Sequence, residues 1–210
     1  MENLDPIIEG IRAALEAKNA ARDATLARSR ELIRLCALSI RATHRQEFDQ
    51  AEQLLGEARR ASDQMKAAIV AHPDLYHAGY TQDALKEVVE AVAVYAIVRG
   101  RPLPAPHELG VDPGAYLNGL AEAASELRRR ALDVIRQDRS AEAERLLTAM
   151  DDIYGELVTM DFPDAITGGL RRTTDMLRCV LERTRGDLTA TLQQEKLKKA
   201  LEEFEGRMKQ

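Results

Sequence analysis

The chain has 210 residues, of which 45% are hydrophobic and 31% charged, and its formal net charge is −5. This length and composition are typical of one globular domain, expected to span residues 1–210, and the acidic balance gives no overall attraction for nucleic acid. No apolar run approaches the roughly eighteen residues of a membrane span, and the first residues do not resemble a signal peptide. We therefore expect a cytoplasmic protein that makes no membrane contact.

The hydrophobic pattern is helical from end to end, and Pro and Gly residues divide it into about seven helices. Three lie in the first half, over about 5–44, 45–71 and 81–99. The first begins at the cap-and-proline pair Asp5-Pro6, and the third ends before Gly100. Residues 72–80 form a connector between the second and the third.

The second half is predicted to hold the remaining helices. A proline-rich loop over 101–111 precedes a helix that runs from the pair Asp112-Pro113 to about residue 137. The next helix spans about 140–160, and Asp164 then caps another one. Gly186 predicts a helix stop before the last helix. No segment alternates as a strand does, so the predicted fold class is all-α.

The two cysteines, Cys36 and Cys179, lie far apart in the sequence, each within a helical pattern. Their spacing matches no metal-binding motif, and a reducing compartment disfavours a disulfide bond between them. We expect two buried, reduced thiols.

The third predicted helix carries the sharpest chemical signal. It is apolar nearly all round after Val88, which predicts burial in a core or between subunits, yet it contains Glu90. Glu87 lies one turn earlier, so both carboxylates project from the same side of the helix. Two acids on a buried element repel each other, and a bound cation relieves that repulsion. The competing interpretation is a solvated face beside Lys86, which suits Glu87 better than Glu90.

Other charged groups have ordinary interpretations when each is taken alone. Glu126, and Asp152 with its neighbour Asp151, lie off the apolar faces of their helices, as solvated acids do. The arginines that could contact phosphates have an equally ordinary interpretation as charged helix surface. They are Arg30, Arg34, Arg41, Arg45, Arg128, Arg129, Arg171 and Arg172. Aromatic residues are scarce, so phosphate contact is favoured over base reading.

Three stretches, taken in order, resemble the translin family, which comprises translin and translin-associated factor X. They are SRELIRL through HR over 29–45, LKEVVEAV over 85–92, and YLNGL with ASEL over 116–127. The run RTRGDL over 183–188 also looks like the prokaryotic members. The resemblance implies an all-α fold that assembles as an octameric barrel with an enclosed cavity. It also implies binding of single-stranded RNA, with single-stranded DNA as a further ligand.

The acidic pair places the chain nearer to one branch of this family. Translin itself lacks the pair, whereas the factor X type carries it and is a Mg²⁺-dependent endoribonuclease acting on single-stranded RNA. The resemblance assigns catalytic and metal-binding roles to Glu87, Glu90, Glu126 and Asp152, with Asp151 as an alternative to Asp152. It assigns Mg²⁺ as the cofactor, with Mn²⁺ as a substitute. In a hollow assembly, acids that point away from the core of their own bundle can face the internal cavity.

Two other classes of function remain open at this point. One is a non-catalytic protein that binds single-stranded RNA or DNA, as translin does, and the other is a purely structural helical bundle. The chain holds the acidic set by itself, so a homo-oligomer is expected, although a second homologous subunit is compatible with the sequence. The number of metal ions and the arginines that contact RNA are also left open.

Overall fold

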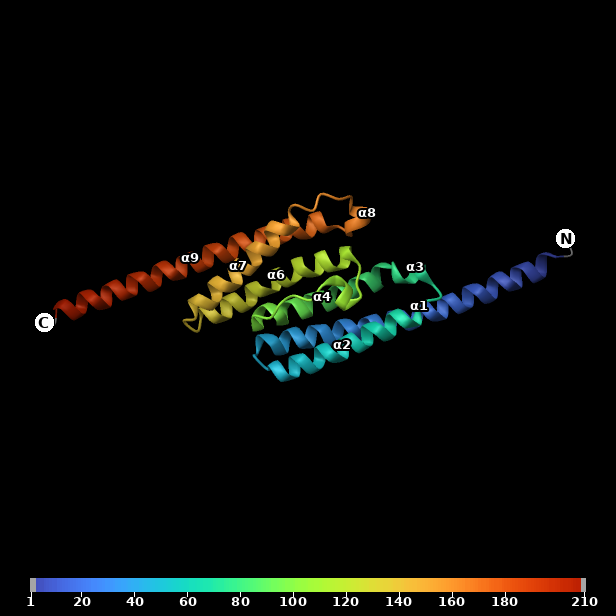
Figure 1. The fold of residues 1–210 in the computed structure, drawn as a ribbon, viewed down its shortest axis with the longest axis horizontal. Helices are drawn as coiled ribbons and strands as arrows, with labels where there is room; N and C mark the ends of the chain where they lie inside the picture. The colour runs from blue at the N-terminus through green and yellow to red at the C-terminus, as the bar shows by residue number, and fades with distance from the viewer. Residues whose placement is uncertain (1–2, 209–210) are drawn as a thin grey trace.

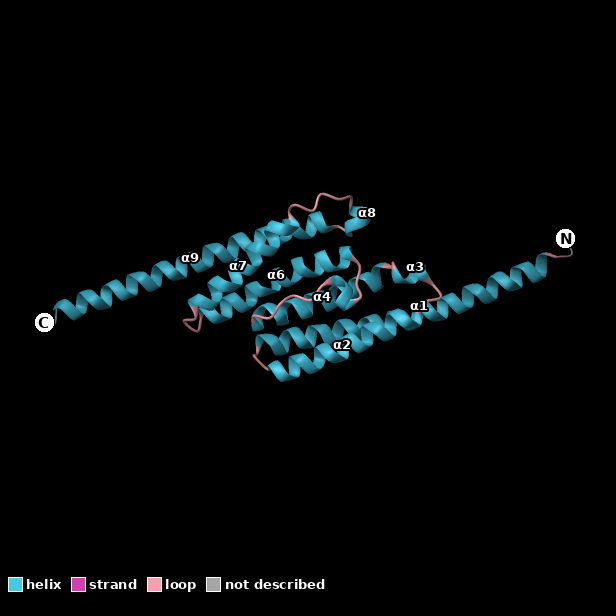
Figure 2. Ribbon diagram, in the orientation of Figure 1, coloured by secondary structure: helices cyan, strands magenta, loops and turns pink. Residues whose placement is uncertain are grey.

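The computed structural model describes residues 3–208, and every regular element in that range is a helix (Figures 1 and 2). The long helices are α1 (Leu4–His44), α2 (Phe48–Ala68), α4 (Gly79–Arg99), α6 (Pro113–Ile135), α7 (Ser140–Leu157) and α9 (Leu170–Met208). Single turns in the connections form α3 (Pro73–Tyr76), α5 (Pro106–Leu109) and α8 (Asp164–Thr167). The predicted all-α class is confirmed.

Helix α4 lies in the middle of the bundle. It packs against α1 and α2 on one side and against α6 on the other, while α6 also packs against α7 and α9 (Figure 1). Leu85, Val89 and Val94 of α4 are almost completely buried in the main hydrophobic cluster. The prediction that this helix is buried is therefore confirmed, and its acidic residues are carried on the central element of the fold.

The first and last helices extend beyond the bundle at opposite ends of the molecule (Figure 1). The extension of α1 exposes Ile8, Ile11 and Leu15, and the extension of α9 exposes Leu201 and Phe204. No helix within residues 3–208 is both long enough and apolar enough to cross a membrane.

The helix stop predicted at Gly186 is wrong, because α9 continues through it to Met208. Gly186 lies on the exposed side of α9, whereas Leu181, Thr184 and Leu188 continue the buried face across it. A glycine inside a helix costs only about 1 kcal/mol, so packing on both sides outweighs the local signal.

The prediction of two buried thiols is correct for one cysteine only. Both cysteines are free, but Cys36 is buried in α1 while Cys179 is exposed on α9. A helical pattern identifies the element that carries a cysteine. The face that turns toward solvent depends on which helices pack against that element.

Candidate metal centre

Helices α4 and α6 approach each other very closely at Gly119. A Cβ atom at this position would lie 2.6 Å from Cβ of Val89 and 2.7 Å from the carbonyl oxygen of Lys86. No side chain fits at such distances, so the close approach requires glycine. One turn further along α6, the backbone contact brings Glu122 beside the acids of α4.

Three carboxylates meet where the two helices approach. Glu87 and Glu90 of α4 and Glu122 of α6 each offer an oxygen, and these oxygens all lie within 4.8 Å of one another. All three side chains are partly exposed. We call these residues the carboxylate cluster. Glu126 lies one turn beyond Glu122 on α6, and its charge acts on Glu90.

The cluster is electrostatically strained when it holds no cation. Burial raises the pKa of Glu90 to about 8, and the charges of Glu87, Glu122 and Glu126 add to the effect. Burial and the charge of Glu122 also raise the pKa of Glu87. Glu90 is therefore held mainly in its protonated form at neutral pH. Cys36 lies on the neighbouring helix α1, where burial and the charges of Glu87 and Glu90 raise the pKa of its thiol to about 12.

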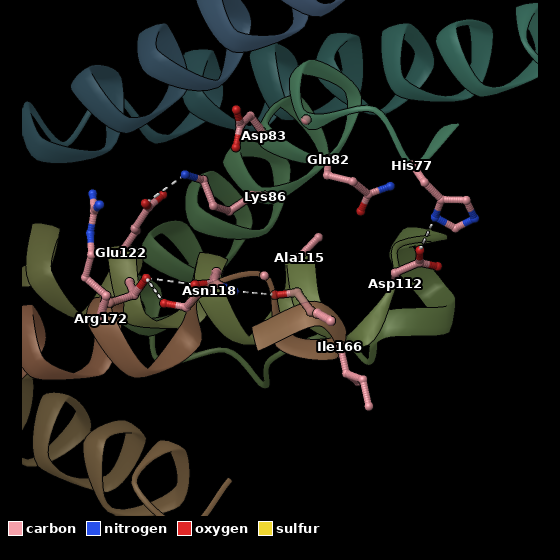
Figure 3. A pocket seen from close by; sticks show the side chains of 16 residues that line it. His77, Gln82, Asp83, Lys86, Asp112, Ala115, Asn118, Glu122, Ile166 and Arg172 are labelled. Carbon is pink, nitrogen blue, oxygen red and sulfur yellow. Dashed lines mark hydrogen bonds and ion pairs between the residues drawn. The ribbon is translucent and has the colours of Figure 1, made fainter. Parts of the chain in front are cut away.

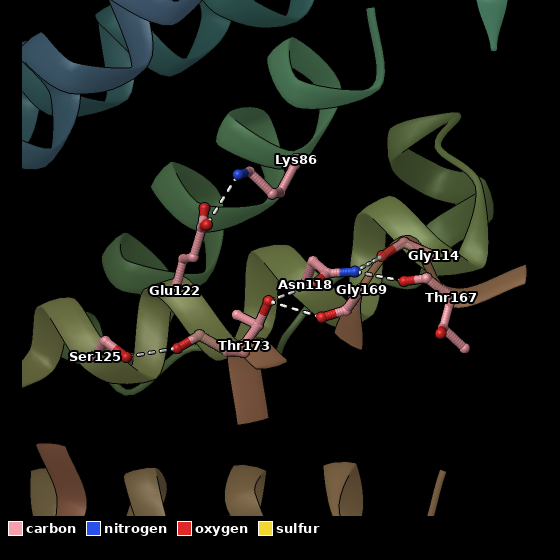
Figure 4. Close-up of polar contacts among 9 residues, drawn as sticks. Lys86, Gly114, Asn118, Glu122, Ser125, Thr167, Gly169 and Thr173 are labelled. Atoms are coloured by element: carbon pink, nitrogen blue, oxygen red, sulfur yellow. Dashed lines mark hydrogen bonds and ion pairs between the residues drawn. The ribbon is translucent and has the colours of Figure 1, made fainter. Parts of the chain in front are cut away.

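The acids of α6 already have basic partners. Nζ of Lys86 lies 2.8 Å from Oε1 of Glu122 (Figure 4), and Nε2 of His44 lies 2.8 Å from Oε1 of Glu126. His44 is buried, and its carbonyl oxygen accepts a hydrogen bond from Arg130 at 3.4 Å. Among residues 3–208, neither Glu87 nor Glu90 forms an ion pair. Lys86 pairs with Glu122, so in the described part of the chain its charge acts on the two α4 acids without an ion pair.

A polar pocket of about 610 Å³ adjoins the cluster, with Lys86 and Glu122 in its wall (Figure 3). Asn118 in the same wall donates hydrogen bonds to the carbonyl oxygens of Gly114 and Thr167, at 2.8 and 2.7 Å. It also accepts one from Thr173 at 2.8 Å. These bonds tie α8 and the start of α9 to α6, so the far wall of the pocket is held in place.

Asp152 does not join the cluster in the described structure. It lies on the exposed side of α7, whose buried face packs mainly against α6 and α9 rather than α4. The alternative, Asp151, forms an ion pair with Arg185 at 2.8 Å. Glu122 stands beside Glu87 and Glu90 instead. The missed signal was that Glu122 and Glu126 lie one turn apart on one helix, much as Glu87 and Glu90 do.

Seven of the eight predicted phosphate-contacting arginines lie on three helices, and Arg45 directly follows the end of α1. Arg45 and the arginines of α1 are exposed, and two of these side chains pair locally, Arg34 with Glu31 and Arg45 with Glu47. The remaining ones on this helix are Arg30 and Arg41.

The arginines of α6 and α9 lie nearer to the acids. Arg129 is exposed, with Nη1 4.0 Å from Oε1 of Glu126, and Arg172 lines the polar pocket (Figure 3). Arg128 is held by Thr184 and Asp187, at 3.1 and 2.8 Å, and Arg171 is exposed at the start of α9. Of the predicted arginines on these two helices, Arg129 thus lies beside Glu126 and Arg172 lies in the wall of the pocket.

Comparison with known proteins gives relatives across nearly the whole chain. No sequence model of a known family matches it. An uncharacterized protein of Methanocaldococcus jannaschii is 32% identical over 187 residues, which cover 88% of this chain and 82% of that protein.

Solved structures also match along the chain. The C3PO protein of Archaeoglobus fulgidus in complex with duplex RNA is 36% identical, with a TM-score of 0.82 over 88% of this chain and 95% of that one. A second structure of the same protein is 35% identical, with a TM-score of 0.81 over 88% and 96% of the two chains. NeC3PO shares the fold, with 21% identity and a TM-score of 0.77 over 91% and 98%.

Proposed function

The chain belongs to the translin family and is similar to the factor X-like C3PO proteins. From that premise we propose that it is a Mg²⁺-dependent endoribonuclease acting on single-stranded RNA. The observation that carries the proposal is the cluster of Glu87, Glu90 and Glu122 on the central helices of the fold. The similar C3PO protein was solved in complex with duplex RNA, which supports RNA as the ligand class.

The residues of the cluster fit a hard divalent cation. Carboxylate oxygens are the ligands that Mg²⁺ and Mn²⁺ prefer, and these cations keep several waters when a site offers few protein ligands. The raised pKa values of Glu87 and Glu90 reflect first their burial and then the charges of the neighbouring carboxylates, which a bound cation would offset. Glu87, Glu90 and Glu122 would hold one or two ions, whereas the buried thiol of Cys36 keeps its proton.

The other side chains around the cluster have separate roles in this proposal. A divalent cation held by Glu87, Glu90 and Glu122 would supply Lewis-acid chemistry, activating water and neutralising charge on the scissile phosphate. Glu126, oriented by His44 at 2.8 Å, is placed to accept the proton of the attacking water. Arg129 and Arg172 attract the RNA backbone, so binding weakens as the salt concentration rises.

We extend the proposal to assembly as a homo-oligomer, with the octameric barrel as the expected form. The projecting end of α1 exposes Leu4, Ile8, Ile11 and Leu15, and that of α9 exposes Leu197, Leu201, Phe204 and Met208. Both sets repeat at spacings of four, three and four residues, the pattern of a helix that packs against another helix. Contacts between copies would cover these seams, and a closed assembly would enclose the acids in a cavity.

Cleavage of labelled single-stranded RNA by the purified protein, with Mg²⁺ or with EDTA, tests the proposal. We expect cleavage only with the metal, and a loss of about a thousandfold or more in rate in Glu90→Gln and Glu122→Gln. Asp152→Asn is the matched control, because this acid lies outside the cluster, and it should keep near wild-type activity. RNA retention without cleavage in every condition would instead place the chain with the non-catalytic binding proteins.

A further inference from the structure

Lys86 places a positive charge at the edge of the carboxylate cluster. It directly precedes Glu87 on α4, and its Nζ lies 2.8 Å from Oε1 of Glu122 (Figure 4). Burial lowers the pKa of Lys86, but the hydrogen bond that Lys86 donates to Glu122 and the charges of Glu122, Asp83 and Glu87 outweigh burial and raise that pKa. Lys86 thus forms a half-buried ion pair with Glu122, with only 22% of its side chain exposed.

This ammonium already does part of what a metal ion would do. The positive charge of Lys86 lowers the pKa of both Glu87 and Glu90, against the effects of burial and of the neighbouring acids. It also holds Glu122 of α6 against α4. An ammonium and a divalent cation repel each other at short range, and both seek the same carboxylate oxygens.

We propose that Lys86 is a resident counter-ion of the carboxylate cluster, which stabilises the metal-free protein and competes with the divalent cation for Glu122. This inference rests on the proposed metal centre and goes beyond it, because it assigns a residue that sets how tightly the metal binds. Lysine suits the role, since its ammonium is a point charge on a flexible stem that can leave one partner for another.

The structure provides space for Lys86 to release Glu122. Lys86 lines the polar pocket of about 610 Å³, together with Gln82, Asp83 and Asp112 (Figure 3). Asp83 lies on the same helix and already acts on Lys86 through its charge. The ammonium can therefore turn from Glu122 toward the pocket and stay hydrated and partly compensated there.

The affinity for Mn²⁺ alone, without RNA, tests this role directly. We would titrate the full-length protein with Mn²⁺ and follow the free ion by electron paramagnetic resonance. Lys86→Met removes the charge but keeps the length of the side chain, and we expect its Kd for Mn²⁺ to be about tenfold lower than that of the wild type. Its Tm in EDTA should be lower than that of the wild type, and Mn²⁺ should raise it by more.

Lys66→Met is the matched control. Lys66 lies on α2, its side chain is 21% exposed, and it pairs with Asp63 at 3.1 Å, but it is not part of the cluster. Its substitution should leave the Kd for Mn²⁺ unchanged. Lys86→Gln keeps a donor for Glu122 without the charge, so it should also bind Mn²⁺ more tightly, and it serves if Lys86→Met does not fold.

The outcomes separate this inference from the proposed function. If the wild type binds Mn²⁺ and neither Lys86 variant binds it more tightly, Lys86 is not a competing counter-ion, but the metal centre stands. If Mn²⁺ binds neither the wild type nor the variants, both proposals fail. If the Lys86 variants bind Mn²⁺ more tightly than the wild type does, the result supports the inference, even where the wild type binds weakly.

Discussion

Replacing Glu90 by glutamine should make the metal-free protein more stable at pH 8 while leaving its stability at pH 4.5 almost unchanged. Burial and the neighbouring acids place the pKa of Glu90 at about 8 in the folded chain, against 4.5 as its ordinary value. The folded state therefore binds more protons than the unfolded state between these pH values, and the free energy of unfolding falls as pH rises through that window. The stabilising contribution of the protonated form is complete below pH 4.5 and lost above pH 8.

The size of this effect follows from the two pKa values. The difference (8 − 4.5) corresponds, at about 1.4 kcal/mol per pKa unit, to roughly 5 kcal/mol as an upper limit. Glu90 is partly exposed and coupled to its neighbours, so we expect about 2–4 kcal/mol between Glu90→Gln and the wild type at pH 8. Glu87, whose pKa is also raised, should leave part of the pH dependence in the variant.

Urea denaturation in EDTA, over a series of pH values from 4.5 to 8.5, measures the effect. Glu156→Gln is the control, because Glu156 is an exposed acid of α7 outside the cluster, and it should follow the wild type at every pH. Mn²⁺ at a thousand times Kd should reverse the order, since only the wild type gains from native-state binding, about 4.1 kcal/mol at that concentration. Parallel pH profiles for the wild type and Glu90→Gln in EDTA would refute the claim that burial and the neighbouring acids raise the pKa of Glu90.

Three further outcomes are expected. Gly119→Ala should lower the free energy of unfolding by about 1–3 kcal/mol and weaken Mn²⁺ binding, because the added Cβ would force α6 away from Val89 and Lys86. A thermal melt measures the loss, and an unchanged Tm would contradict the close approach of the two helices. Arg172→Ala should weaken RNA binding and reduce the slope of log K against log salt by about 1, as seen by fluorescence anisotropy, unless this arginine makes no phosphate contact. Ile11→Glu should reduce the mass measured by light scattering, and an unchanged mass would show that the projecting end of α1 is not an interface.

Local sequence patterns determined the helices and the element that carries the acids. Helical periodicity and the Pro and Gly residues at the ends predicted α1, α4 and α6 closely, because these signals act within a few residues of where they stand. The apolar surroundings of Glu90 predicted a buried helix with an acid on it, since a helix that is apolar all round has to be covered. The one-turn spacing of Glu87 and Glu90 predicted that they share a face.

Only the tertiary structure decided which residues complete the site. Lys86 and Glu122 are 36 residues apart, and His44 and Glu126 are 82 apart, so no local pattern connects either pair. Helical periodicity shows which side chains share a face of one helix, but not how closely another helix approaches that face. That approach is set at Gly119, where the missing side chain lets α6 reach α4 and bring Glu122, not Asp152, to the acids. Packing likewise carried α9 through Gly186, because the buried face of a long helix outweighs a single local stop signal.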